Sequence, residues 1–248
     1  LRMAIVTERA ASWVCHLGQE HSELLVPVVN QLLAPVAPPA DPAGDLGPLQ
    51  WVLDHAAEGI PLTQNHTLGR ACVVETTDRF GWRLLDSAPR SEYDSPHVHT
   101  THALARAVGA VRRRGRTLLL TTTGKALRAD PVRLWRAAMQ SLCRGDDFSA
   151  AVGELALAVL LHAGHATHTQ VAEAVAVGVG DRWRDANGRA PGLAAVRHHL
   201  WDTLRPALLV GALAETGRWP DERLLVVPDD AGVREALRSR AVGPLHHP

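Results

Sequence analysis

Four arginines lie within five residues, at Arg112, Arg113, Arg114 and Arg116. A guanidinium group keeps its positive charge and donates paired hydrogen bonds to phosphate oxygens. Residues 105–145 hold ten of the 26 basic residues but one of the 26 acidic residues, although the chain has no net charge. This asymmetry indicates a polyanionic partner, and contact with the phosphates of a nucleic acid is the chemistry that it predicts.

Three histidines just before this basic stretch have the spacing HxHxxH, at His97, His99 and His102. This spacing resembles the metal motif HxHxDH of the metallo-β-lactamase fold. Thr101 stands where that motif has aspartate, and the surrounding sequence lacks the strands that the fold needs. Two imidazoles three residues apart on a helix make a poor metal site by themselves. The favoured interpretation is therefore ordinary surface histidines, with a metal-dependent hydrolase as the least favoured alternative.

A second run of histidines, His162, His165 and His168, falls where a predicted helix ends. The helix dipole favours cationic histidine at such an end, so a structural role is expected. The sequence has no GxSxG, P-loop or GxGxxG motif, and Cys72 lies in an apolar run that is typical of a core position. We therefore expect a non-enzymatic protein with no catalytic residue, no metal and no other cofactor.

The cysteines and the apolar segments indicate the cellular compartment of the protein. The three cysteines are widely spaced and form no CxxC motif, which favours a reducing compartment. No stretch stays apolar for the roughly 18 residues that a membrane span needs. The first residues lack the apolar core and cleavage site of a signal peptide. A cytoplasmic protein without a membrane partner is expected.

A predicted helix positions the residues that precede the arginines. It begins after Ser95, a favourable N-cap, with Pro96 at its first position, and it stops at Gly109. The helical period places one set of residues on a core-facing side: Val98, Thr101, Leu104, Ala105 and Val108. The opposite, exposed side is predicted to carry His99, His102, Ala103 and Arg106.

The arginines themselves fall in a predicted β-hairpin. Its first strand covers residues 110–113, its turn is Arg114-Gly115, and its second strand opens with Arg116 and continues through residues 117–122. The threonines and leucines of that second strand are typical of a β-strand. A closing helix is expected to begin at Asp130-Pro131.

Three helices followed by a basic hairpin resemble a winged helix, and AVRRRGRTLLLTTTG at residues 110–124 is similar to the wing of MarR-type regulators. The resemblance implies that the hairpin tip contacts the phosphate backbone and that the preceding helix enters the major groove of DNA. The nucleic-acid-binding residues that it predicts are His99, His102, Arg106, Arg112, Arg113, Arg114, Arg116 and Lys125.

The chain repeats this pattern once. Residues 49–65 resemble 155–171, and 117–128 resemble 223–238 at a similar offset. Each repeat is interpreted as helix, short strand, helix, helix, β-hairpin and helix. We predict a mostly α fold with small β-hairpins (α+β), built as tandem winged-helix-like modules, an arrangement that also resembles uncharacterised actinobacterial proteins with paired modules of this kind.

Three parts are expected along the chain. Residues 1–47 form an N-terminal helical segment and a Pro-rich linker, residues 48–145 a module with the basic wing, and residues 146–248 a module with an acidic wing. The charged residues of the second wing are Glu215, Arg218, Asp221, Glu222, Arg223, Asp229 and Asp230. Phosphates would repel this wing, so the second module is expected to serve dimerisation or protein binding. Its third helix carries Arg197, His198 and His199, which leaves a weaker nucleic-acid role open.

The expected function is that of a nucleic-acid-binding protein, and transcriptional regulation is the role that the resemblance suggests. The leading alternative is a non-enzymatic winged-helix scaffold whose arginines meet an acidic protein. A solvated basic turn without any ligand is the remaining interpretation of the hairpin.

Overall fold

The computed structural model describes residues 28–32, 34–83, 87–144, 147–180, 183–216 and 224–242. The chain divides into two compact units. Ala40–Ser141 forms the hairpin unit, and Leu1–Pro39 together with Leu142–Pro248 forms the C-terminal unit. The predicted boundaries fall at residues 48 and 146, with the first 47 residues as a separate part.

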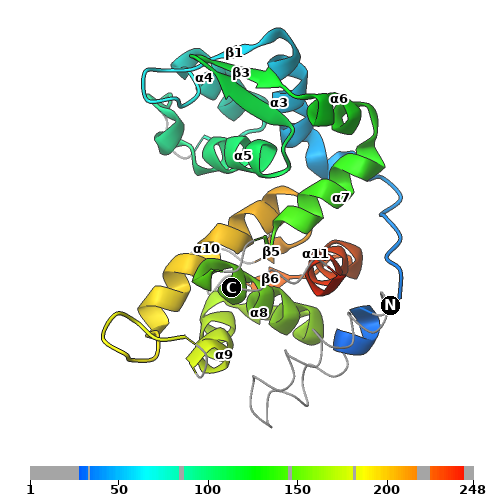
Figure 1. Ribbon diagram of the computed structural model, residues 1–248, viewed down its shortest axis with the longest axis vertical. Helices are drawn as coiled ribbons and strands as arrows, with labels where there is room; N and C mark the ends of the chain where they lie inside the picture. The colour runs from blue at the N-terminus through cyan, green and yellow to red at the C-terminus, as the bar shows by residue number, and fades with distance from the viewer. Residues whose placement is uncertain are drawn as a thin grey trace. The chain divides into compact units, whose positions relative to one another are not determined.

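The hairpin unit is a group of helices with one small antiparallel sheet. Its elements are, in chain order, η1 (Gly44–Leu46), α3 (Gly47–Glu58), β1 (Ile60–Pro61), α4 (Arg70–Arg79), η2 (Glu92–Asp94), α5 (Pro96–Ala107), β2 (Val111–Arg114), β3 (Thr117–Leu120), α6 (Thr122–Ala129) and α7 (Pro131–Ser141). The three strands lie in the order β1-β3-β2, so β2 is an edge strand. Figure 1 shows this sheet with α3, which contacts β3, and α5, which contacts β2.

The core of the hairpin unit lies where α3, α5 and the sheet meet. Helix α3 buries Leu49, Trp51, Val52, Leu53 and Ala56. It ends at Gly59, whose φ of 96° is a conformation that residues with a Cβ rarely adopt. Helix α5 buries Val98, Thr101, Leu104 and Ala105, as its helical period predicts.

The observed hairpin is shifted by one residue from its predicted position. Arg114 pairs with Thr117 as the last pair of the ladder, so the turn is formed by Gly115 and Arg116. Gly115 has a φ of 61°, as a two-residue hairpin turn with glycine first requires. The second strand ends at Leu120, and α6 begins at Thr122, although the sequence predicts that the strand continues to residue 122.

Thr121 links the hairpin to α6. Its hydroxyl accepts a hydrogen bond from the N–H of Gly124 at 2.8 Å, as an N-cap does. The same hydroxyl donates to the carbonyl oxygen of Gly109 at 2.7 Å, just before β2 begins. The backbone N–H of Thr121 donates to the carbonyl of Ala110 at 2.9 Å. Thr121 therefore ends the strand, starts the helix and closes the base of the hairpin.

Thr121→Ala is expected to lower the free energy of unfolding by about 1–2 kcal/mol, because the helix loses its cap. Thr121→Ser keeps the hydroxyl and serves as the matched control, with a loss of no more than about 0.5 kcal/mol. Urea unfolding of both variants measures the difference. Equal losses in the two variants would show that the hydroxyl contributes nothing.

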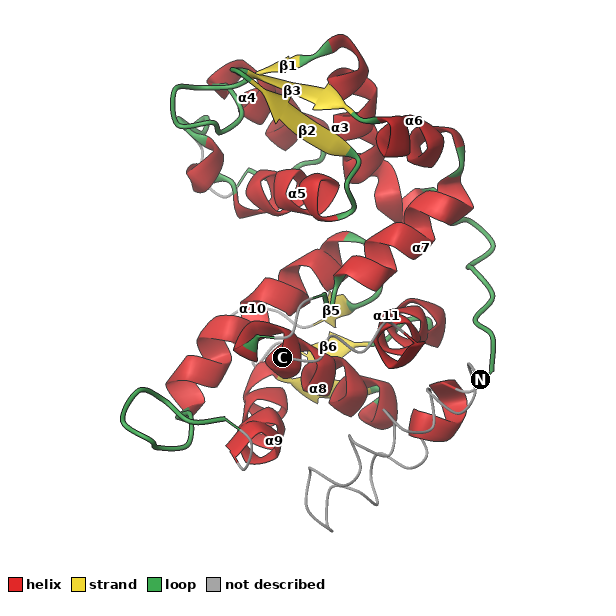
Figure 2. Cartoon of the chain, in the orientation of Figure 1, coloured by secondary structure: helices red, strands yellow, loops and turns green. Residues whose placement is uncertain are grey.

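The C-terminal unit follows the same order of elements. They are α8 (Phe148–Ala163), β4 (His165–Thr167), α9 (His168–Gly180), α10 (Leu193–Leu209), β5 (Ala214–Thr216), β6 (Leu224–Val226) and α11 (Asp230–Val242). The strands lie in the order β4-β6-β5, and Figure 2 shows them as short strands among the helices of this unit. Helix α8 is the central element and contacts α9, α10 and α11.

Two close contacts show how this unit is assembled. A Cβ at Gly153 of α8 would lie 2.0 Å from Thr203 Oγ1, so glycine is what allows α8 and α10 to approach each other here. Residues 28–32 are helical, and Arg238 of α11 donates to the carbonyl oxygens of Leu32 and Ala34. This part of the predicted N-terminal helices thus packs with the C-terminal unit, and their earlier part lies outside the described residues.

The predicted fold class is confirmed at the coarse level: the protein combines helices with two small three-stranded antiparallel sheets. The predicted order of helix, short strand, helix, helix, hairpin and helix is present in both units. Of the second wing, Arg218, Asp221, Glu222 and Arg223 lie outside the described residues. Within the described ranges, no helix has the length and apolar character needed to cross a membrane.

Candidate nucleic-acid interface

The four hairpin arginines are exposed side chains on β2 and its turn. Val111, which opens β2, is buried and anchors the strand against the core. From Arg112 to Arg116 every residue is exposed, so the charged part of the hairpin extends beyond the core of the unit.

The arginine side chains project from both faces of the hairpin. Successive residues of a strand point to opposite faces, and directly paired residues share a face. Arg113 pairs with Leu118, which is 1% exposed and faces the core. Arg112 pairs with Leu119, and Arg114 with Thr117, so these two arginines lie on the other, half-exposed face. The hairpin therefore carries positive charge on either side.

The arginines of the hairpin have no anionic partner among the described residues. No hydrogen bond or ion pair joins the side chains of Arg112, Arg113, Arg114 or Arg116 to any described group, and the same holds for Arg106 and Lys125. By contrast, Arg83 lies 2.6 Å from Asp78, and Arg128 lies 2.7 Å from Asp54. The hairpin thus presents an uncompensated positive charge.

Helix α5 exposes two of the three side chains that the sequence predicts to contact nucleic acid. Arg106, at its C-terminal end, and His99 are exposed. His102 is not: its side chain is 7% exposed, and the prediction that it faces the groove is wrong. It lies four residues after Val98 and three before Ala105, on the face that packs against the core.

A buried carboxylate accounts for the position of His102. Glu92 of η2 is 1% exposed. Its Oε1 lies 3.0 Å from Nδ1 of His102 and 3.2 Å from Nδ1 of His99, and its Oε2 accepts a 2.6 Å hydrogen bond from the N–H of Leu68. Burial acts to raise the pKa of Glu92, but the hydrogen bonds from His102 and Leu68 and the nearby histidine charges outweigh it and lower the pKa. Glu92 therefore holds α5 against the segment that precedes α4.

The sequence predicts no role for Glu92. No local motif marks it, because its partners lie 24 residues earlier at Leu68 and 10 residues later at His102. The only local sign is the capping box of η2, in which Ser91 and Asp94 exchange hydrogen bonds around this residue.

In the C-terminal unit, charges and aromatic rings are paired with one another. Nε2 of His168 lies 2.9 Å from Oε1 of Glu215, so one acid of the predicted second wing contacts α9. The ring of His168 packs on Trp201 with centroids 4.7 Å apart, and the guanidinium of Arg205 lies over the same indole. Trp201 is 38% exposed, so it lies at the surface rather than in the core. Trp51, in contrast, is buried.

The potential metal ligands and the cysteine thiols of the described residues form no reactive site. Within the described ranges, no group of three or more His, Cys, Asp or Glu side chains is arranged to hold a metal ion. Burial raises the pKa of the Cys72 thiol to about 11, although this residue is half-buried rather than fully in the core. Burial also raises the pKa of Cys143. Neither thiol is a ready nucleophile, because the thiolate is the reactive form.

Comparison with known proteins gives a family-model match to part of the chain. No curated protein and no solved structure matches the chain. Residues 49–133 match the model of the Y4jL N-terminal domain family. The match runs from α3 into α7 and includes the whole basic hairpin. Over this part, the hairpin unit is similar to a Y4jL N-terminal domain.

Proposed function

We propose that the hairpin unit is a winged-helix-like module that binds nucleic acid through its basic hairpin. The order of its elements and the position of the hairpin directly after α5 support this interpretation. The observation that carries the proposal is the cluster of exposed arginines without any anionic partner among the described residues. Phosphate groups are the ligands that complete such a cluster.

The distribution of the arginines favours a duplex over a single strand. A groove of a duplex has a phosphate backbone along each side, and its major groove is wide enough to admit a two-stranded β-ribbon. Arg113 reaches out from one face of the hairpin, and Arg112 and Arg114 reach out from the other. A hairpin placed in or along a groove can therefore contact both backbones at once.

We propose that the C-terminal unit is a second winged-helix-like module with a different role. It repeats the order of elements, but Glu215 on β5 takes the place of a basic wing and is engaged by His168. Acidic groups oppose phosphate contact. Dimerisation or binding of a protein partner is the role that fits this unit, and the basic hairpin supplies the nucleic-acid contact.

The test compares a hairpin variant with a charge-matched control on a labelled duplex of random sequence. The hairpin variant replaces Arg112, Arg113, Arg114 and Arg116 by alanine. At low salt it is expected to bind about 100-fold more weakly or worse than the wild type, since four phosphate contacts are lost. Fluorescence anisotropy measures the dissociation constants.

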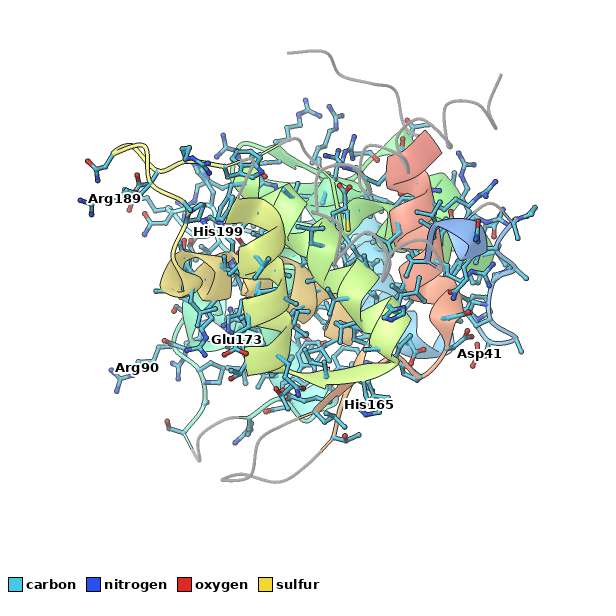
Figure 3. The ribbon with its side chains drawn as sticks, turned by 90° about the horizontal axis from the view of Figure 1, so that it is seen from below. Asp41, Arg90, His165, Glu173, Arg189 and His199 are labelled. Carbon is cyan, nitrogen blue, oxygen red and sulfur yellow. The ribbon has the colours of Figure 1, made fainter. Side chains whose placement is uncertain are left out.

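The control variant replaces Arg79, Arg90, Arg136 and Arg189, which are exposed arginines outside the hairpin. Figure 3 shows Arg90 and Arg189 extending away from the ribbon. The control removes the same net charge, so it is expected to retain affinity within about 10-fold of the wild type. Equal losses in both variants, or no binding by the wild type at low salt, would contradict the proposal and favour an acidic protein as the partner of the hairpin.

A further inference from the structure

The exposed face of α5 has few groups that can read base edges. Its exposed residues are His97, His99, Ala103, Arg106 and Ala107. The two alanine side chains have no hydrogen-bonding group, so they cannot distinguish the polar edges of the bases. Base reading from α5 by hydrogen bonds therefore depends on its histidines and on Arg106.

The histidines of α5 are committed to contacts within the protein. The ring of His97 stacks on Trp82 with centroids 5.1 Å apart. Nδ1 of His99 lies 3.2 Å from Oε1 of the buried Glu92, and its ring packs against Tyr93. His99 can thus offer a ligand at most its second ring nitrogen. Arg106, exposed and without a described partner, is the one α5 side chain that can make a bidentate contact with guanine.

We infer that the hairpin unit binds duplex nucleic acid through its backbones with little selection of base sequence, an inference that rests on the proposed function. The hairpin places three arginines on its two faces and a fourth in its turn, where they meet phosphates, which are the same at every base pair. Helix α5 supplies one side chain, Arg106, that can make a bidentate contact with a base. The ligand class is therefore duplex nucleic acid in general, and Arg106 provides a weak local preference.

The expected size of this preference follows from one good base contact. Such a contact discriminates between bases by a factor of about 5 to 150, whereas sequence-specific proteins prefer their sites by about 1,000-fold or more. The best duplex should therefore bind no more than about 150-fold more tightly than an unrelated duplex of the same length.

The experiment first selects duplexes from a random pool with the whole chain. Competition anisotropy at one fixed salt concentration then measures the ratio of affinities between the best selected duplex and unrelated duplexes. A ratio below about 150 supports the inference. Arg106→Ala should reduce the remaining preference while binding to unrelated duplexes weakens only slightly. Arg133→Ala, an exposed arginine on α7, is the single-charge control and should leave the preference unchanged.

Selection of one motif that binds about 1,000-fold or more tightly than unrelated duplexes would overturn the inference and leave the proposed function intact. An unchanged preference in Arg106→Ala would overturn the role given to that residue. If no duplex is bound at low salt, the proposed function itself fails. The three failures are thus distinguishable from one another.

Discussion

Glu92→Ala is expected to lower the free energy of unfolding of the hairpin unit by about 3–5 kcal/mol. The substitution leaves the N–H of Leu68 and Nδ1 of His102 buried without their acceptor. It also removes most of a side chain that is 1% exposed. A loss of this size is a large part of the total stability of a domain. Amide hydrogen exchange of peptides from α5, followed by mass spectrometry, reads the opening of this unit directly.

His99→Ala is the matched control, because it removes the exposed half of the same network. The side chain of His99 is 51% exposed, so the control should cost no more than about 1 kcal/mol. A loss below about 1 kcal/mol in Glu92→Ala would show that the buried carboxylate does not hold α5 in place.

The pH dependence of this contribution has a defined sign. The folded pKa of Glu92 is lowered from its ordinary value of 4.5, so the ionised carboxylate stabilises the fold above that value. The stabilisation is lost as the pH falls from 4.5 through the folded pKa. Glu92→Gln lacks this titration, so its difference in stability from the wild type should shrink over that range. A difference that stays constant from neutral to acidic pH would contradict the assignment.

Gly124→Ala is expected to destabilise the hairpin unit by about 3 kcal/mol, although alanine is normally the better residue within a helix. A Cβ at this position would lie 2.0 Å from the carbonyl oxygen of Ala110 and 2.7 Å from Cδ1 of Leu120. The first neighbour is backbone at the base of the hairpin and cannot rotate away. Relief of the contact must therefore separate α6 from the base of the hairpin. Urea unfolding measures the loss of stability.

Thr123→Ala, an exposed change in the same helix, is the control and should alter stability by no more than about 0.5 kcal/mol. If Gly124→Ala instead stabilised the protein by about 1 kcal/mol, ordinary helix propensity would govern the position and the close approach would be disproved.

The hairpin and its helix could be predicted because their signals are local. Pro96 begins α5, Gly109 follows its end, and Gly115 supplies the positive φ of the turn. The prediction erred by one residue in the turn, since Arg114 belongs to the ladder and Arg116 to the turn. Charge patterning located the candidate site because the four arginines lie within five residues of the sequence.

Helix α6 could not be predicted from its residue types. The run Thr121, Thr122 and Thr123 is β-branched and is typical of a strand. Thr121 instead acts as an N-cap, and Gly124 permits the close approach of α6 to Ala110. Both effects depend on the tertiary structure, which overrides the local preference.

The burial of His102 depends on a partner that sequence patterns do not reveal. Its position on the core face followed from its spacing to Val98 and Ala105, but a histidine there requires an acceptor. Glu92 supplies that acceptor from a different element. A helical wheel that had grouped His102 with Val98 and Ala105 would have found its burial, but not Glu92.

The salt dependence of duplex binding tests the basic hairpin most directly. Four arginine–phosphate contacts contribute about −3.6 to the slope of log binding constant against log salt concentration. The variant with Arg112, Arg113, Arg114 and Arg116 replaced by alanine should lose about that much of the slope, and the control lacking Arg79, Arg90, Arg136 and Arg189 should keep it. A slope that is the same in the wild type and the hairpin variant would contradict the account.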